Sequence, residues 1–328
     1  VLHSSLDRGR IAELLADEEL DDNVREMLVL RRDGGRSSTA KFERMLSAGS
    51  SLDRLQGMYM YWGAGTGRYT AKLVQPHNLP RERTDIPLDV IEPEHLKDAI
   101  ELFEGPVLNA LPKLIRPSLT ARKGYTMVGG DFAQIEARML ALCAGEETIL
   151  QRYREGEDVY THTAAEVCEV PLAEVTKDMR QLGKTLDLSC GYSGGSGAVM
   201  RSGVKFGVEL TPEEAASLVK RWRLNHNKTV AFWNLLHRAA KEAVVHPGIE
   251  FAANKFVYLC EGDYLHCLLP SGRVLTYAYP ETRNVEGPFG DNVELFCLNS
   301  RAKPGKNDDQ WPQRQLWRGV LVENVIQA

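Results

Sequence analysis

The amino-acid sequence predicts an α+β protein that is rich in helices and divided into two or three lobes. The chain has 328 residues, which is longer than most single hydrophobic cores. Apolar residues recur near helical spacing in the charged segment 7–48, whereas the short apolar run at residues 125–130 is typical of a buried strand. Turn residues at Pro270, Ser271 and Gly272 predict a hairpin.

The composition is that of an ordinary globular protein, with 43% hydrophobic and 26% charged residues. No run of about 18 apolar residues occurs, so we expect no membrane segment and no membrane partner. The six cysteines lack the spacing of a zinc site, which predicts reduced thiols in a cytoplasmic protein. The chain begins with Val1 and lacks the apolar core of a signal peptide, so we expect a segment of a longer protein.

The charge of the chain is unevenly distributed. Its formal net value of −5 argues weakly against a nucleic-acid partner. Residues 180–245, however, carry ten basic and five acidic side chains. This stretch either faces phosphate groups or forms a solvated helix face, and the sequence leaves both interpretations open.

The first part of the chain predicts a helical lobe over residues 7–48, with a break at a glycine pair. Residues 57–80 are aromatic and glycine-rich, which favours irregular or extended backbone. Their three alternating glycines superficially resemble a dinucleotide-binding loop. No strand–turn–helix unit surrounds these glycines, so that interpretation is disfavoured.

In the middle of the chain, residues 125–130 predict a strand that delivers Asp131, followed by an apolar-faced helix over 135–143. Thr176 is a suitable cap for a helix that continues to the glycines of GYSGG.

The later helices also have sequence signals. Thr211, Pro212 and Glu214 predict a capping box at the start of a helix, because proline suits the first helical position. A long helix is expected around residues 232–245, and a final helix from about Gly319.

Two segments carry residues suited to nucleotide chemistry. Asp131, in GGDFAQIEAR, is at the expected end of a strand, where a carboxylate can point toward a metal ion, although a helix N-cap is the alternative. In MRQLGKTLDLSCGYSGG, Arg180, Lys184 and Leu188 are four residues apart and share a helix face, with about 40° of drift per step. The two cations suit β- and γ-phosphate oxygens, and Leu188 and Tyr192 suit a base and sugar. Taken alone, the same spacing equally describes a surface helix with an apolar stripe.

Together these segments resemble a known family. DFAQIEAR resembles motif A of the family A (DNA polymerase I-like) DNA polymerases, and RxxxKxxxLxxxY resembles their motif B. Upstream, TGRYTAKLVQPHNLP resembles the element of that family that contacts primer-template DNA. The resemblance runs from about Ser37 to the last residue and is closer to phage-type members. It implies a right-hand polymerase fold with a small mixed or antiparallel palm sheet, and template-directed DNA synthesis from dNTP in a bacterial or phage-infected cell.

The resemblance also implies roles for matching residues. Asp131 would bind both Mg²⁺ ions, with the backbone carbonyl of Phe132 beside it. Arg180 and Lys184 would take the triphosphate, with Lys184 as the candidate proton donor to pyrophosphate.

Other matches concern the sugar and the DNA. Glu136 and Tyr192 would close the space under the sugar C2′ and exclude ribonucleotides. The remaining matches are Gln134, Tyr160 and Leu188 in the nucleotide pocket, and Arg68, Gln75 and Asn78 on the primer-template.

Two positions depart from the family pattern. Leu188 replaces the usual aromatic residue, so base stacking and tolerance of dideoxynucleotides should differ. Tyr160 stands where many members carry histidine, which leaves that triphosphate contact open. His162 nearby is expected to be a packing residue.

The implied lobes are a partial thumb over residues 1–56, a palm over 57–144, fingers over 145–300 and a return to the palm over 301–328. Two alternatives remain. A single-subunit RNA polymerase relative is not expected to have glutamate at Glu136, and a catalytically inactive module would retain only the primer-template groove.

A third family motif, usually His-Asp-Glu, does not occur between Tyr192 and Ala328. We therefore expect a missing C-terminal segment to supply the second metal-binding aspartate, and this chain alone to be inactive. Asp308 and Asp309 lie in a polar, proline-flanked stretch and are not expected to substitute for it.

Overall fold

The computed structural model describes residues 8–17, 19–34, 37–50, 54–80, 84–88, 90–105, 107–287, 290–299 and 311–328. The chain folds into two compact units. The first consists of Val1–Ala64 and Tyr69–Gly130, and the second of Gly65–Arg68 and Asp131–Ala328. The division into thumb, palm and fingers stays a prediction.

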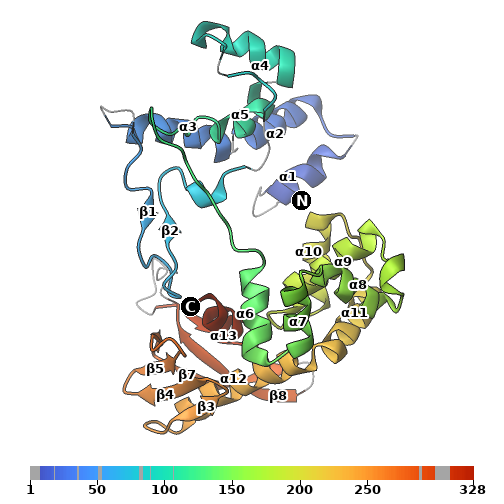
Figure 1. The fold of residues 1–328 in the computed structure, drawn as a ribbon, viewed down its shortest axis with the longest axis vertical. Helices are drawn as coiled ribbons and strands as arrows, with labels where there is room; N and C mark the ends of the chain where they lie inside the picture. Colours follow the sequence, from blue (N-terminus) through green and yellow to red (C-terminus); the bar gives the residue numbers. More distant parts are fainter. Residues whose placement is uncertain are drawn as a thin grey trace. The chain divides into compact units, whose positions relative to one another are not determined.

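The first unit is mainly helical, which confirms the helical lobe expected over residues 7–48. Its helices are α1 (Arg8–Leu15), α2 (Asp22–Gly34), α3 (Ser37–Ala48), α4 (Leu96–Glu104) and α5 (Val107–Ile115), with 3-10 turns η1 (Pro76–Asn78) and η2 (Pro93–His95). A short antiparallel ribbon of β1 (Tyr59–Met60) and β2 (Thr70–Ala71) carries the glycine-rich stretch (Figure 1).

A small apolar core stabilises this unit. Ile100 of α4 packs with Ala110 and Leu114 of α5 and with Ile86 from the preceding loop. Phe42 of α3 covers the cluster. Burial of this apolar surface holds the three helices together.

The strand predicted over residues 125–130 is not formed, so this prediction was wrong. Tyr125, Met127 and Val128 are instead exposed, at 61%, 64% and 94%. An extended segment becomes a stable strand only when a neighbour satisfies its backbone N–H and C=O groups. No segment among the described residues pairs with this one.

In the second unit, the first helices are α6 (Ile135–Ala144), α7 (Glu147–Glu155), α8 (Val159–Cys168) and α9 (Lys177–Cys190), with a 3-10 turn η3 (Leu172–Glu174). The Thr176 side chain accepts a hydrogen bond from the Met179 backbone N–H at 3.2 Å, which confirms the predicted cap of α9. The helix ends at the glycine-rich turn, as expected.

The next helices are α10 (Ser196–Phe206), α11 (Pro212–Asn225) and α12 (Asn227–Val245). Thr211 and Glu214 form the predicted capping box at the start of α11, each accepting a backbone N–H of the other. Helix α12 includes the predicted segment 232–245 and begins five residues earlier, at Asn227.

All strand pairs in the described residues are antiparallel, and they confirm the α+β class. One sheet has the order β3–β4–β5–β6, and the predicted hairpin turn joins β5 to β6. The second has the order β7–β8–β9. The strands are β3 (Phe251–Ala253), β4 (Phe256–Glu261), β5 (Tyr264–Leu268), β6 (Val274–Ala278), β7 (Glu281–Gly287), β8 (Gly290–Leu298) and β9 (Gln313–Gln315).

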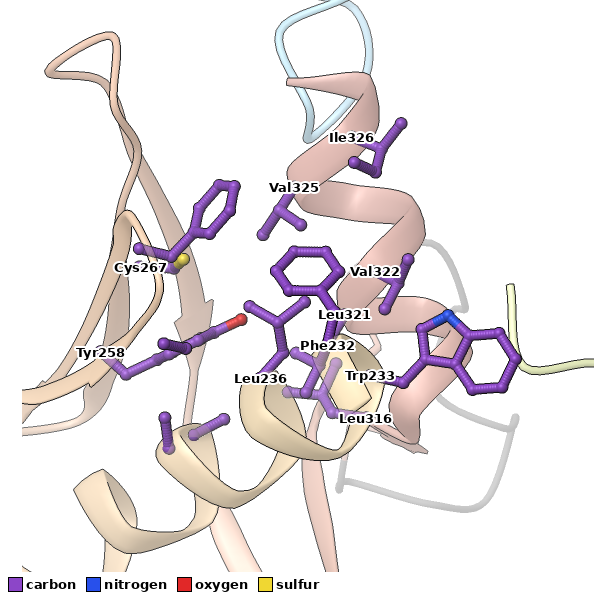
Figure 2. Close-up of a cluster of buried hydrophobic side chains, with 14 of the residues drawn as sticks. Phe232, Trp233, Leu236, Tyr258, Cys267, Leu316, Leu321, Val322, Val325 and Ile326 are labelled. Carbon is purple, nitrogen blue, oxygen red and sulfur yellow. The ribbon is translucent and has the colours of Figure 1, made fainter. Parts of the chain in front are cut away.

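The core of the second unit lies between the first of these sheets, α12 and the final helix α13 (Arg318–Gln327). Alternate residues of β4 and β5 turn inward, so Tyr258 and Cys267 lie opposite each other on the buried face. Figure 2 shows Phe232 and Leu236 of α12 between these strands and α13, with Trp233 on the other side of the helix.

The six cysteines are all free, and burial raises the pKa of the Cys190 thiol to about 12. No helix in the described ranges has the length and apolar character needed to cross a membrane.

Helices α8 and α9 approach closely at a glycine. A Cβ on Gly183 would lie 2.3 Å from the Tyr160 carbonyl oxygen and 2.9 Å from the Ala164 backbone nitrogen. Both neighbours are backbone atoms, so the helices would have to separate to admit a side chain. This contact places Tyr160 beside the first turns of α9.

We predict that Gly183→Ala destabilises the protein by about 1–3 kcal/mol, because the strain of overpacking exceeds the gain in helix propensity. Gly197→Ala in α10 is the matched control, since its Cβ would meet only the flexible Arg201 side chain, at 3.4 Å. That variant should be neutral or slightly more stable in urea unfolding. Equal unfolding midpoints for the two variants would contradict the prediction.

Candidate functional site

Glu136, in the first turn of α6, is the centre of a hydrogen-bonded cluster. Its Oε2 accepts a hydrogen bond from the hydroxyl group of Tyr192 at 2.7 Å. Tyr192 lies just beyond the end of α9. Glu136 Oε1 accepts from Arg68 Nη1 at 3.2 Å and from Gln327 Nε2 of α13 at 3.3 Å. One carboxylate therefore joins four segments that are distant in sequence.

Tyr192 is held in this cluster as a hydrogen-bond donor. Burial raises the pKa of its hydroxyl well above the usual value, and the bond to Glu136 raises it further. The ring is half-buried and packs against the core. The predicted pairing of Glu136 with Tyr192 is therefore present as a direct contact.

Arg68 is brought to Glu136 by an arginine that sequence analysis did not identify. Arg273, next to the β5–β6 turn, donates from Nη2 to the Thr66 carbonyl at 2.7 Å. Gly67 has a positive φ of 82°, and its Cβ position would overlap the Arg273 guanidinium. Glycine at this position lets the arginine hold this loop against the rest of the second unit, to which the loop itself belongs.

Arg180 is on the exposed side of α9 and pairs with Asp158, directly before α8. Its Nε and Nη2 both donate to the Asp158 carboxylate, the latter at 3.2 Å. Burial alone would raise the pKa of Asp158, but hydrogen bonds from Arg180 and Thr161 lower it below its usual range. The Arg180 guanidinium also lies 5.6 Å from the Tyr160 ring centroid.

Lys184 and Leu188 follow Arg180 on α9. Lys184 Nζ lies 4.8 Å from the Phe206 ring centroid and forms no ion pair within the described part of the chain. Leu188 is 45% exposed, so an apolar side chain is accessible on the same helix. Two cations and an accessible leucine are thus present on α9, as the spacing predicted.

Helix α9 is anchored to its neighbours by Asp187, seven residues after Arg180. Its carboxylate accepts from Trp222 Nε1 of α11 at 2.7 Å and from Thr163 Oγ1 of α8 at 3.0 Å, and His226 Nε2 lies 4.0 Å away. Burial raises the pKa of Asp187 to about 6, although His226 and the two hydrogen bonds lower it. These bonds fix the rotation of α9 about its axis.

Asp131 is exposed and lies three residues before the N-cap of α6. That N-cap is Gln134, so the alternative of a capping role for Asp131 is excluded. Phe132 is also exposed, at 79%. Gln134 has a left-handed backbone, with φ of 53°, and its Oε1 accepts from the Tyr153 hydroxyl at 2.9 Å.

The other predicted residues occupy separate places. Gln75 and Asn78 flank and end η1 in the first unit, and Gln75 has a left-handed backbone. His162 Nε2 lies 2.8 Å from Glu157 Oε2 and is largely buried, consistent with a packing histidine.

Four contributors escaped sequence analysis: Asp158, Asp187, Arg273 and Gln327. Asp187 shares the predicted α9 with Arg180 and Lys184, but no local pattern indicates its partners on α8 and α11. The others act across long sequence separations and have no local motif.

No group of three or more histidine, cysteine, aspartate or glutamate residues in the described ranges could hold a metal ion. Asp131 and the Phe132 carbonyl are oxygen donors, which suit Mg²⁺. They are too few to form a complete coordination shell. Asp308 and Asp309 lie outside the described residues.

Comparisons with known proteins identify the family of the chain. The family model for "DNA polymerase family A" matches residues 37–249. A DNA polymerase of Bacillus phage SP02 is 34% identical over 331 residues, covering 99% of this chain and 50% of the phage protein. This chain therefore spans about half the length of that relative. The thermostable DNA polymerase I of Thermus aquaticus is 30% identical over 117 residues, which cover 36% of this chain and 14% of that protein.

A solved structure gives a likeness at the level of the fold. It is the POL domain of Pol1 from M. smegmatis in complex with DNA primer-template and dNTP, with a TM-score of 0.50 and 18% identity. The match covers 72% of this chain and 36% of that chain.

We predict that Asp187→Asn changes the pH dependence of stability. A carboxyl group with a raised pKa stabilises the fold below its unfolded pKa and loses that contribution as pH rises through about 6. The stability of the natural protein relative to Asp187→Asn should therefore fall by roughly 2 kcal/mol between pH 4 and 7. Calorimetry across this range, with Asp263→Asn in an exposed turn as control, checks it. A constant difference would show that folding does not raise the pKa of Asp187.

Proposed function

Because the chain belongs to DNA polymerase family A, we propose that it carries the nucleotide-binding part of a DNA-directed DNA polymerase. The reaction transfers a nucleotide from dNTP to a primer 3′-hydroxyl, as directed by a template strand. The observation that supports this proposal best is the Glu136 cluster, which holds Tyr192 and Arg68 at the end of α9. The predicted cytoplasmic location stays a prediction.

The exposed side of α9 is the proposed triphosphate site. Arg180 and Lys184 are cations suited to neutralise β- and γ-phosphate oxygens, and Lys184 is the proposed donor of a proton to the pyrophosphate leaving group. Asp158 orients Arg180 before the nucleotide arrives, and Arg180 exchanges part of this ion pair for phosphate oxygens. Tyr160, beside Arg180, is proposed to contact the triphosphate through its hydroxyl.

The sugar and base are proposed to lie against the end of α9. Glu136 and Tyr192, joined by their 2.7 Å hydrogen bond, are the proposed barrier to a 2′-hydroxyl group. Gln134 borders the same pocket, and Leu188 supplies an aliphatic platform for the nucleotide.

Asp131 is the proposed metal ligand, with the Phe132 carbonyl beside it. Mg²⁺ prefers oxygen donors and commonly binds through one or two carboxylates together with substrate phosphates. When bound, two Mg²⁺ ions stabilise the attacking and leaving oxygens. A single aspartate leaves excess positive charge, so we propose that a second carboxylate comes from a segment outside these 328 residues.

The proposed DNA partner is a primer-template duplex. Arg68 is proposed to contact the minor groove at the primer terminus while bound to Glu136, and Gln75 and Asn78 are proposed as further duplex contacts. A catalytically inactive module that only binds primer-template DNA would not need the Arg180–Lys184 face. An RNA polymerase would not need Glu136 as a barrier to ribose.

Replacing Asp131 by Ala in the full-length protein should abolish primer extension while primer-template binding persists, because a metal-binding carboxylate is lost. We expect a fall of about a thousandfold or more in rate. Single-turnover extension assays check this, with Asp263→Ala as the exposed control. Near-normal extension by Asp131→Ala would refute the metal role.

Glu136→Ala should admit ribonucleotides, since it both opens space under the sugar and frees Tyr192. Tyr192→Phe tests the hydrogen bond alone and should relax discrimination less than Glu136→Ala does. The ratio of kcat/KM for dNTP and rNTP is the measurement. If neither variant changes this ratio, the two residues do not form the barrier.

Leu188→Phe should alter the use of dideoxynucleotides relative to dNTP, because an aromatic ring replaces the aliphatic platform. Leu224→Phe, at an exposed position of α11, is the matched control. Chain-termination ratios on a primed template measure the effect. Identical ratios for both variants would remove Leu188 from the nucleotide site.

A further inference from the structure

A cavity of about 400 Å³ lies behind the turn that carries Tyr192. It is formed within the second unit by the end of α9, by α11 and α12, by β8 and β9, and by the start of α13. Its volume falls in the range of small-molecule sites. None of the residues predicted for the nucleotide site lines this cavity, so it is a separate feature.

The cavity has an aromatic wall. The Trp317 ring lies against Gly319, where a Cβ would be 2.2 Å from it, and is still 41% exposed. Trp233 is almost fully buried and lines the same cavity deeper in the core. An accessible indole on a fixed support is suited to stacking against a planar ring.

Two arginines in the lining, Arg223 and Arg318, supply positive charge that could bind an anion. Arg318 is exposed, and its Nη1 donates to Asn234 Oδ1 at 2.8 Å, which anchors the side chain. Arg223 donates from Nη2 to the Gly194 carbonyl at 3.1 Å, while its Nε is buried without a hydrogen-bond partner. Glu294 is the single acidic residue in the lining, so the arginines outnumber it.

A second buried nitrogen in the lining also lacks a partner. His237 Nε2 forms no hydrogen bond and lies 3.7 Å from Glu294 Oε2. Burial lowers the pKa of His237 to about 4, so its ring is neutral at physiological pH. Buried polar atoms normally have hydrogen-bond partners, so these two nitrogens leave unsatisfied polar groups beside the cavity.

We propose that this cavity binds one nucleoside phosphate unit, with its base on Trp317 and its phosphate on Arg318. This inference rests on the proposed function, because a DNA polymerase would meet a nucleoside phosphate in two forms. The bound unit is either a free nucleotide or an unpaired nucleotide of the template strand. Both sources share the same chemistry: a planar base with hydrogen-bonding edges and an anionic phosphate.

The cavity is mechanically connected to the Glu136 cluster. Trp233 Nε1 donates to the Gly191 carbonyl at 3.0 Å, and the Gly319 Cβ position is 2.3 Å from the Tyr192 carbonyl oxygen. Ser193, the next residue, lines the cavity itself. A nucleotide in the cavity would therefore steady the turn that positions Tyr192.

The test uses the full-length protein and two kinds of probe. Equilibrium dialysis with dAMP measures binding of the free nucleotide. Fluorescence anisotropy, with the dye at the far end of the duplex, compares primer-templates with template overhangs of no, one and three nucleotides. The variants are Trp317→Ala, Trp317→Phe and Arg318→Gln, and the controls are the exposed Trp311→Ala and Arg201→Gln.

One of the two probes, dAMP or the template overhang, is expected to occupy the cavity. Trp317→Ala should weaken binding of that probe about tenfold, and Trp317→Phe should weaken it less because it keeps an aromatic face. Arg318→Gln should weaken it as well. If the source is the template strand, Arg318→Gln should also reduce the slope of log K against log salt by about 0.7, because one phosphate contact is lost. The control variants should bind as the natural protein does.

The outcomes separate this inference from the proposed function. If primer-template binds but neither the overhang nor dAMP responds to the Trp317 and Arg318 variants, the cavity is not a nucleotide site, and the proposed function stands. If no primer-template binds, the proposed function fails, and dAMP binding alone decides the inference. If the single variants Arg318→Gln and Trp317→Phe are both folded and bind dAMP as the natural protein does, the inference is overturned.

Discussion

The burial of one face of α12 is the constraint on which the second unit depends. Phe232, Leu236 and Ala240 recur at helical spacing on this face and meet the inward side chains of the β3–β6 sheet. Helix α13 closes the cluster from the other side, with Leu321 and Val322 fully buried. Because apolar burial is non-directional, this core fixes which elements are neighbours but not the orientation of polar groups.

Polar contacts above this core set those orientations. Trp233, on α12, uses its indole N–H to hold the Gly191 carbonyl, and the chain then turns so that Tyr192 reaches Glu136. Gln327 extends the same cluster to α13. A half-buried carboxylate that accepts hydrogen bonds from three segments is strongly directional, so the geometry of this cluster is fixed far more narrowly than packing alone would require.

Helix α9 shows how one element serves packing and chemistry at once. Asp187 ties the helix to α8 and α11, and the small volume of Gly183 lets α8 approach. With these contacts made, Arg180 and Lys184 are left on the part of the helix surface next to Asp187. The +2 charge of that face is only partly offset, since Arg180 has the Asp158 carboxylate and Lys184 has an aromatic ring.

The sequence by itself determined the local features of this protein. The Thr176 cap, the Thr211 capping box, the β5–β6 hairpin and the four-residue spacing on α9 depend on side chains a few residues apart, so their physics is contained in the sequence. The pairing of Glu136 with Tyr192 was instead predicted from the resemblance of two sequence motifs to a known family.

Only the tertiary structure decided what depends on distant partners. The segment 125–130 has strand-like residues but no strand beside it, and an unpaired backbone does not form a strand. Asp158 beside Arg180 and Arg273 on the Thr66 carbonyl join residues far apart in the chain, the latter by more than two hundred positions. Such contacts follow from which surfaces meet when apolar faces are buried, and no local pattern specifies that meeting.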